Sequence, residues 1–143
     1  MYKDIDDKFI MEACKDSGLT DFISGVSLDY VVGQNGAMLS GGQKQRISLA
    51  RALAVRPSIL ILDDTTSAVD METEKQIQEA LRHLDFSCTK VIIAQRISTT
   101  MMADKILVMQ HGRITEMGNH EELMAKKGYY YELVQLQTGE DLV

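Results

Sequence analysis

The chain has 143 residues, the size of one ordinary domain. Its hydrophobic fraction of 45% and charged fraction of 25% are typical of globular proteins, which excludes a disordered, collagen-like or coiled-coil chain. The net charge is −6, with 15 Lys and Arg against 21 Asp and Glu and no basic tract, so nonspecific nucleic-acid binding is not expected.

The apolar runs of this sequence are short. The clearest are 59–62, 91–94 and 106–109, and a bilayer crossing needs about 18–20 apolar residues. The N-terminus is polar and acidic, unlike a signal peptide. Any membrane role is therefore expected to come through a partner chain.

Helical and strand patterns alternate along most of the chain, which indicates βα units and a parallel sheet. The continuous apolar runs 59–62 and 91–94 predict buried strands, the first covered on both faces, and 106–109 predicts a third buried strand. The first forty residues hold no strand pattern. Helices are predicted over 5–16, 21–24, 41–54, 71–84, a short segment after Asn119 and 129–137, and a turn at 110–112 leads into a final strand over 113–116.

The strongest local pattern is a glycine pair at a predicted helix start. The segment reads Leu39-Ser40-Gly41-Gly42-Gln43. Free amides of a helix first turn, approached over glycines, are suited to an anion such as phosphate. The alternative is a plain capping box, since Ser40 and Gln43 fit S-x-x-Q, but that box alone does not explain two glycines.

Polar side chains follow the two predicted parallel strands. Asp63 and Asp64 end the run 59–62, where one carboxylate can hold Mg²⁺ and the other can orient or deprotonate a water. The alternative is a solvated turn. Asp70 is placed to cap the next helix. Gln95 follows the run 91–94, and taken alone it is a weak indication of function.

Together these segments resemble the ATP-binding cassette (ABC) transporters, in the C-terminal half of the nucleotide-binding domain. The details are those of exporters with fused membrane and nucleotide-binding domains, and the resemblance runs from about Asp4 to Leu136. Residues 39–43 match the family signature motif without a change. Residues 59–63 resemble Walker B, 67–70 the D-loop usually written SALD, 91–99 the switch region usually written IIAHRLST, and 113–123 the usual tail.

The resemblance implies an α/β fold, an incomplete P-loop NTPase-like parallel sheet flanked by helices. Residues 1–55 would be the helical, signature-bearing part and 56–143 the second half of the ATPase core. No Walker A sequence, G-x-x-x-x-G-K-[ST], occurs in these 143 residues. The chain is therefore expected to be roughly half of a domain, with an exposed sheet edge and an apolar face that the other half would cover.

The resemblance also implies site roles and two departures from them. Asp63 would bind Mg²⁺, with Asp64 and Gln95 at the catalytic positions of this chain's own ATP site. The family usually has Glu and His at those two positions, so this site is expected to be degenerate. The remaining nucleotide-contacting residues would be Leu39, Ser40, Gly41, Gly42, Gln43 and Asp70.

ATP and Mg²⁺ are the implied cofactors, and hydrolysis is expected only in the context of the whole transporter. The implied partners are a second nucleotide-binding domain, in a heterodimer, and the transmembrane domain of an exporter, with the chain on the cytoplasmic side. Two alternatives stay open. One is a non-catalytic interaction module. The other is a cassette ATPase of the DNA-repair kind, although the long heptad-repeat arms of that class are absent from this sequence.

Overall fold

The computed structural model describes residues 4–63 and 69–139. The chain divides into two compact units, with the boundary between Ile93 and Ala94. Each unit has its own cluster of buried hydrophobic side chains. The predicted division near residue 55 concerns parts of the family domain and stays a prediction.

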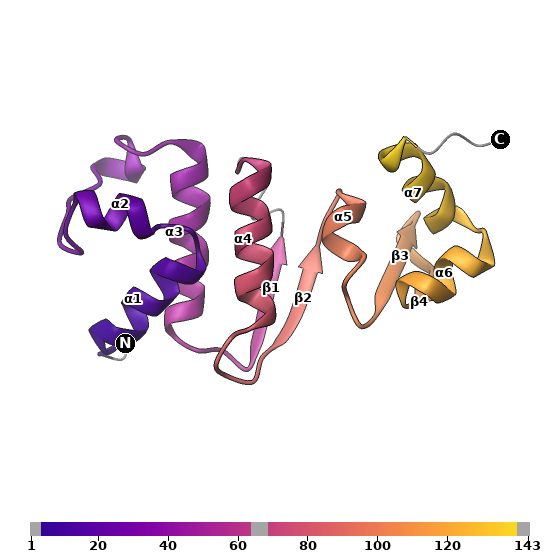
Figure 1. The fold of residues 1–143 in the computed structure, drawn as a ribbon, viewed down its shortest axis with the longest axis horizontal. Coiled ribbons are helices and arrows are strands. Elements are labelled where there is room, and N and C mark those ends of the chain that lie inside the picture. The colour runs from indigo at the N-terminus through magenta and orange to yellow at the C-terminus, as the bar shows by residue number, and fades with distance from the viewer. Residues whose placement is uncertain (1–3, 64–68, 140–143) are drawn as a thin grey trace. The chain divides into compact units, whose positions relative to one another are not determined.

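The first unit contains most of the helices (Figure 1). The helices predicted from the sequence are confirmed, with ends that differ by a few residues, and the loop around residue 34 forms one short 3₁₀ turn. The elements are α1 (Asp7–Asp16), α2 (Thr20–Gly25), η1 (Gln34–Gly36), α3 (Gly41–Ala54), β1 (Ile59–Asp63), α4 (Met71–Arg82) and β2 (Thr89–Ile93).

The two strands of this unit form the predicted parallel pair. Their register runs from Ile59 opposite Thr89 to Asp63 opposite Ile93. Figure 1 shows both strand arrowheads pointing toward the same edge of the unit as the first turns of α3 and α4. Because ligands of open α/β sheets bind outside the carboxyl ends of the strands, this edge is the one that matters for function.

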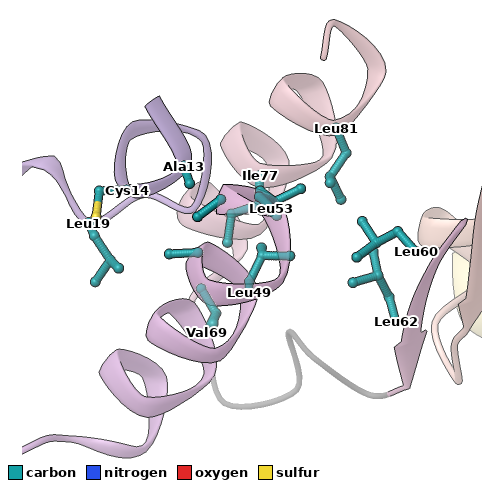
Figure 2. Packing of buried hydrophobic residues seen from close by; sticks show 12 residues of the cluster. Ala13, Cys14, Leu19, Leu49, Leu53, Leu60, Leu62, Val69, Ile77 and Leu81 are labelled. Atoms are coloured by element: carbon teal, nitrogen blue, oxygen red, sulfur yellow. The ribbon is translucent and has the colours of Figure 1, made fainter. Parts of the chain in front are cut away.

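One face of β1 packs on the helices. Leu60 and Leu62 are 3% and 4% exposed and point toward buried side chains of α3 and α4, as Figure 2 shows. Burial of a leucine side chain contributes roughly 1.5–3 kcal/mol. The helix side chains in this cluster include Leu49, Leu53, Ile77 and Leu81.

The other face of β1 is exposed, so the prediction of a strand covered on both faces is wrong within the part of the chain that is described. Ile59 and Ile61 are 64% and 65% exposed. The prediction of a buried second strand is also wrong, since every residue of β2 is exposed. The helices of this unit cover a single face, and the alternation of side chains along a strand sends Ile59 and Ile61 to the opposite one.

The second unit is built on an antiparallel hairpin. Strands β3 (Ile106–Gln110) and β4 (Arg113–Gly118) pair through a two-residue turn. In this turn His111 and Gly112 have φ of 51° and 74°, as the favoured hairpin turn requires. Ile106 and Val108 are buried whereas Leu107 is half-exposed, so the third predicted strand is buried on one face only. The elements are α5 (Ile97–Thr100), which sequence patterns missed, β3 (Ile106–Gln110), β4 (Arg113–Gly118), α6 (His120–Lys126) and α7 (Tyr129–Thr138).

A carboxylate from β4 caps helix α7. Glu116 Oε1 accepts a hydrogen bond from Tyr129 N at 2.6 Å, and Oε2 accepts one from Tyr130 N at 3.4 Å. A Cβ on Gly128 would lie 2.6 Å from that same Oε1. A side chain at this position would therefore have to displace the carboxylate that caps α7. By contrast, α6, the short helix predicted after Asn119, begins with a local capping box formed by Asn119 and Glu122.

Leu123 anchors the core of the second unit and is 0% exposed. Replacing it by alanine should lower the free energy of unfolding of this unit by about 2–5 kcal/mol, because a cavity would take the place of the close-packed leucine side chain. The control Leu136→Ala removes an equally large side chain that is 74% exposed and should change stability by no more than about 0.5 kcal/mol. Urea unfolding followed by tyrosine fluorescence measures both, and equal shifts in the two variants would contradict this packing.

Candidate functional site

The glycine-pair segment forms the start of α3, as predicted. Ser40 Oγ accepts a hydrogen bond from Gln43 N at 3.2 Å, and Gln43 Oε1 accepts one from Ser40 N at 2.9 Å. Both halves of the capping box are therefore present. The first hydrogen bond of the helix backbone follows, from Lys44 N to Ser40 O at 3.0 Å.

The capping box satisfies only two of the four amides at the start of α3. An α-helix begins with four N–H groups that have no partner inside the helix. Here those of Ser40 and Gln43 are used by the box, and those of Gly41 and Gly42 have no acceptor among the described residues. Two free amides at the positive end of a 14-residue helix can bind an oxyanion.

Arg46 fixes this first turn against the rest of the unit. Its Nε donates to Gly42 O at 3.3 Å, and its Nη1 donates to Gly18 O at 2.7 Å. Gly18 has a φ of +68°, which favours glycine at the turn between α1 and α2. Sequence reasoning missed Arg46, because its distant partner is a backbone carbonyl 28 residues away.

The carboxylates predicted at the end of β1 are only partly described. Asp63 is the last residue of β1 and is exposed at the carboxyl edge of the parallel pair, whereas Asp64 lies outside the described residues. No group of three or more His, Cys, Asp or Glu in 4–63 and 69–139 is arranged to hold a metal ion. Mg²⁺ commonly takes only one or two carboxylates and completes its shell with water and phosphate, so a single exposed carboxylate is compatible with such a site, and the metal role of Asp63 stays a prediction.

Asp70 caps α4, as predicted. Its Oδ1 accepts a hydrogen bond from Thr73 N at 2.9 Å, and its Oδ2 accepts one from Thr73 Oγ1 at 2.8 Å. These hydrogen bonds, the backbone one first, hold the pKa of Asp70 below its ordinary value, and the Arg46 guanidinium adds to the effect. Both carboxylate oxygens are therefore engaged in starting the helix.

Gln95 belongs to the second unit and is exposed. It follows the end of β2 by two residues and precedes the short helix α5. Its backbone carbonyl accepts a hydrogen bond from Gln137 Nε2 at 2.9 Å. The amide of Ile97 donates to Gln137 Oε1 at 2.8 Å. Sequence reasoning missed Gln137, which lies about 40 residues further along the chain.

Comparison with known proteins identifies the family. The ABC transporter family model matches residues 6–67. The ABC multidrug transporter atrD of Emericella nidulans is 49% identical over 137 residues, which are 94% of this chain and 10% of that protein. The ATP-dependent lipid A-core flippase of Sodalis glossinidius is 51% identical over 135 residues, 93% of this chain and 23% of that protein. The chain belongs to the ABC transporter family.

A solved structure agrees with this assignment. A bacterial Atm1-family ABC exporter with ATP bound matches with a TM-score of 0.86 and 37% identity, over 94% of this chain and 24% of that one. The fold is that of part of an ABC exporter nucleotide-binding domain, and the chain spans a quarter or less of the length of these relatives. Among the described residues of this ABC transporter segment, no helix is long and apolar enough to cross a membrane.

The lowered pKa of Asp70 predicts a pH-dependent contribution to stability. Because the folded-state pKa lies below the unfolded value, the charge stabilises the fold above about pH 4 and loses this effect as the pH falls through the folded pKa. Asp70→Asn should therefore melt below the unmodified chain at pH 7, and the difference should shrink at about pH 2.5.

A matched control is Asp29→Asn, which alters an exposed carboxylate of the same unit with no hydrogen-bond partner in the described part of the chain. Thermal unfolding at both pH values measures each variant. A difference for Asp70→Asn that stays constant with pH would contradict the charged cap.

Proposed function

We propose that this chain is the C-terminal part of the nucleotide-binding domain of an ABC exporter and acts on two ATP molecules. Residues 39–43 would contact the γ-phosphate of ATP held by a partner domain, and Asp63, Asp64 and Gln95 would face the ATP of this chain's own domain. The observation that carries the proposal is the pair of free amides at Gly41 and Gly42.

The hydrogen-bond donors at the start of α3 are suited to stabilise a phosphoryl group during its transfer. Negative charge grows on the oxygens around the transferred phosphoryl group, and preorganised N–H donors stabilise it most strongly in a site without water. Ser40 adds a hydroxyl whose oxygen already accepts from Gln43 N, which leaves its proton free to be donated. Arg46 keeps this turn in place through its hydrogen bonds to Gly42 O and Gly18 O.

The chain's own site would bind ATP and hydrolyse it poorly. Asp63 would hold Mg²⁺. Asp64 has one methylene less than the glutamate usual in the family, and a misplacement of about 1 Å can cost on the order of 100-fold in rate. Gln95 can donate and accept hydrogen bonds but cannot carry a proton at neutral pH. Asp70, also proposed near the nucleotide, would act mainly by holding the start of α4.

The proposed partners follow from this asymmetry. A second nucleotide-binding domain with intact catalytic residues would form a heterodimer with this chain, and a transmembrane domain would hold both on the cytoplasmic side of the membrane. The relatives named above are a multidrug transporter, a flippase and an exporter, which favours transport over DNA repair. A purely non-catalytic interaction module remains the alternative, and ATP hydrolysis assays separate it from the proposal.

The test of these roles uses the full-length transporter with its partner domain. Gly42→Asp adds a negative charge where the phosphate would approach and should lower ATP turnover at least about 100-fold, or ~2.7 kcal/mol. Asp64→Asn should lower it only modestly, and Asp64→Glu with Gln95→His should raise hydrolysis at the degenerate site. Steady-state ATPase assays compare the three variants.

The matched control is Gly25→Asp, which places the same charge on a glycine that has no atom within 4 Å of the new Cβ. Its turnover should equal that of the unmodified protein. If Asp64→Asn abolishes turnover while Gly42→Asp is tolerated, the assigned roles are reversed and the degenerate site is refuted.

The 143-residue chain by itself should bind Mg-ATP weakly. No Walker A sequence is present in these residues to cradle the phosphates, and the start of α3 offers few donors. We expect a dissociation constant in the millimolar range, about −4 kcal/mol. Isothermal titration calorimetry checks this, and micromolar binding would show that the chain holds a phosphate site other than the one proposed.

A further inference from the structure

The loop that carries Gln95 is held by a single side chain from the last helix. Gln137, near the end of α7, donates from Nε2 to Gln95 O at 2.9 Å and accepts at Oε1 from Ile97 N at 2.8 Å. Both hydrogen bonds have good lengths for N–H···O contacts. The carboxamide therefore spans Arg96 and fixes the backbone on both sides of it.

Only a primary amide can make both contacts. A carboxylate has no proton for the carbonyl of Gln95, and an ammonium has no lone pair for the amide of Ile97. The amide also serves a need of helix α5, because its N-cap residue, Arg96, makes no side-chain capping hydrogen bond. Gln137 provides an acceptor for the first N–H of this helix from 40 residues away.

A buried side chain also anchors the loop, at Ile97. The side chain of Ile97 is 7% exposed and packs in the core of the second unit, whereas Gln95 is exposed. Without the carboxamide, Ile97 would still be held by its side chain, but the backbone at Gln95 would lose the hydrogen bond described here. The backbone that carries the Gln95 side chain is therefore held in part by Gln137.

We propose that Gln137 is a positioning residue for Gln95, holding the switch loop so that the Gln95 side chain reaches bound nucleotide. The nucleotide part of this inference rests on the proposed function above, whereas the hydrogen-bond clamp does not. The hydrogen bonds of Gln137 within the described part of the chain go to backbone atoms of the loop, so it acts through Gln95 and is not a catalytic residue.

The clamp is tested by hydrogen–deuterium exchange of the 143-residue chain, read by mass spectrometry with residue-level fragmentation. In Gln137→Ala the amide of Ile97 should exchange about tenfold faster. In Gln137→Glu it should stay protected, because the carboxylate still accepts that hydrogen bond. Leu136→Ala, an exposed neighbour on the same helix, should leave Ile97 unchanged. Exchange of Ile97 at the original rate in Gln137→Ala would overturn the clamp.

The positioning role is tested in the full-length transporter with its partner domain, by repeating the exchange measurement with saturating Mg-ATP. ATP should slow exchange across residues 95–100 in the unmodified transporter and in Leu136→Ala. In Gln137→Ala and Gln137→Glu this slowing should be lost, because both variants lack the donor to Gln95 O. Equal slowing in all four proteins would overturn the positioning role. No slowing in any of them, with the clamp confirmed, would refute nucleotide binding at this loop and the positioning role with it.

Discussion

Every helix of this chain begins with amides that need acceptors, and the source of those acceptors decides what each helix start can do. The first N–H groups of an α-helix have no partner within it. Local side chains satisfy part of this requirement at α3, α4 and α6. At α5 and α7 the acceptors come from other elements, through Gln137 and Glu116. A helix start whose amides all have acceptors within the protein cannot bind a ligand through them, whereas one with unpaired amides can.

The start of α3 has both kinds of amide, those satisfied by local side chains and those without an acceptor in the described part of the chain. Its capping box satisfies the amides of Ser40 and Gln43 and gives the helix a defined first turn, whereas the amides of Gly41 and Gly42 have no acceptor in 4–63 and 69–139. The capping box and the proposed anion site are therefore not competing interpretations of the same sequence. The box uses two of the four donors, and the glycines keep the other two accessible to a phosphate.

Strand β1 of the parallel pair likewise has one face covered by helices and one face exposed. Leu60 and Leu62 join β1 to the helices, and this packing places Asp63 at the same edge as the starts of α3 and α4. The opposite side of β1 carries Ile59 and Ile61, both largely exposed. Side chains of this kind are typical of a strand with cover on both faces, and the described part of the first unit provides cover on one.

The sequence by itself determined the elements whose causes are local. Helix periodicity and the caps Ser40, Asp70 and Asn119 act within a few residues, so the helices other than α5 were predictable. The motif order was also sufficient to indicate the ABC family. Tertiary structure alone decided which strand faces are buried, because burial depends on what packs there. It also decided the roles of Arg46, Glu116 and Gln137. Their partners lie 28, 13 and about 40 residues away, and no local pattern encodes contacts across such distances.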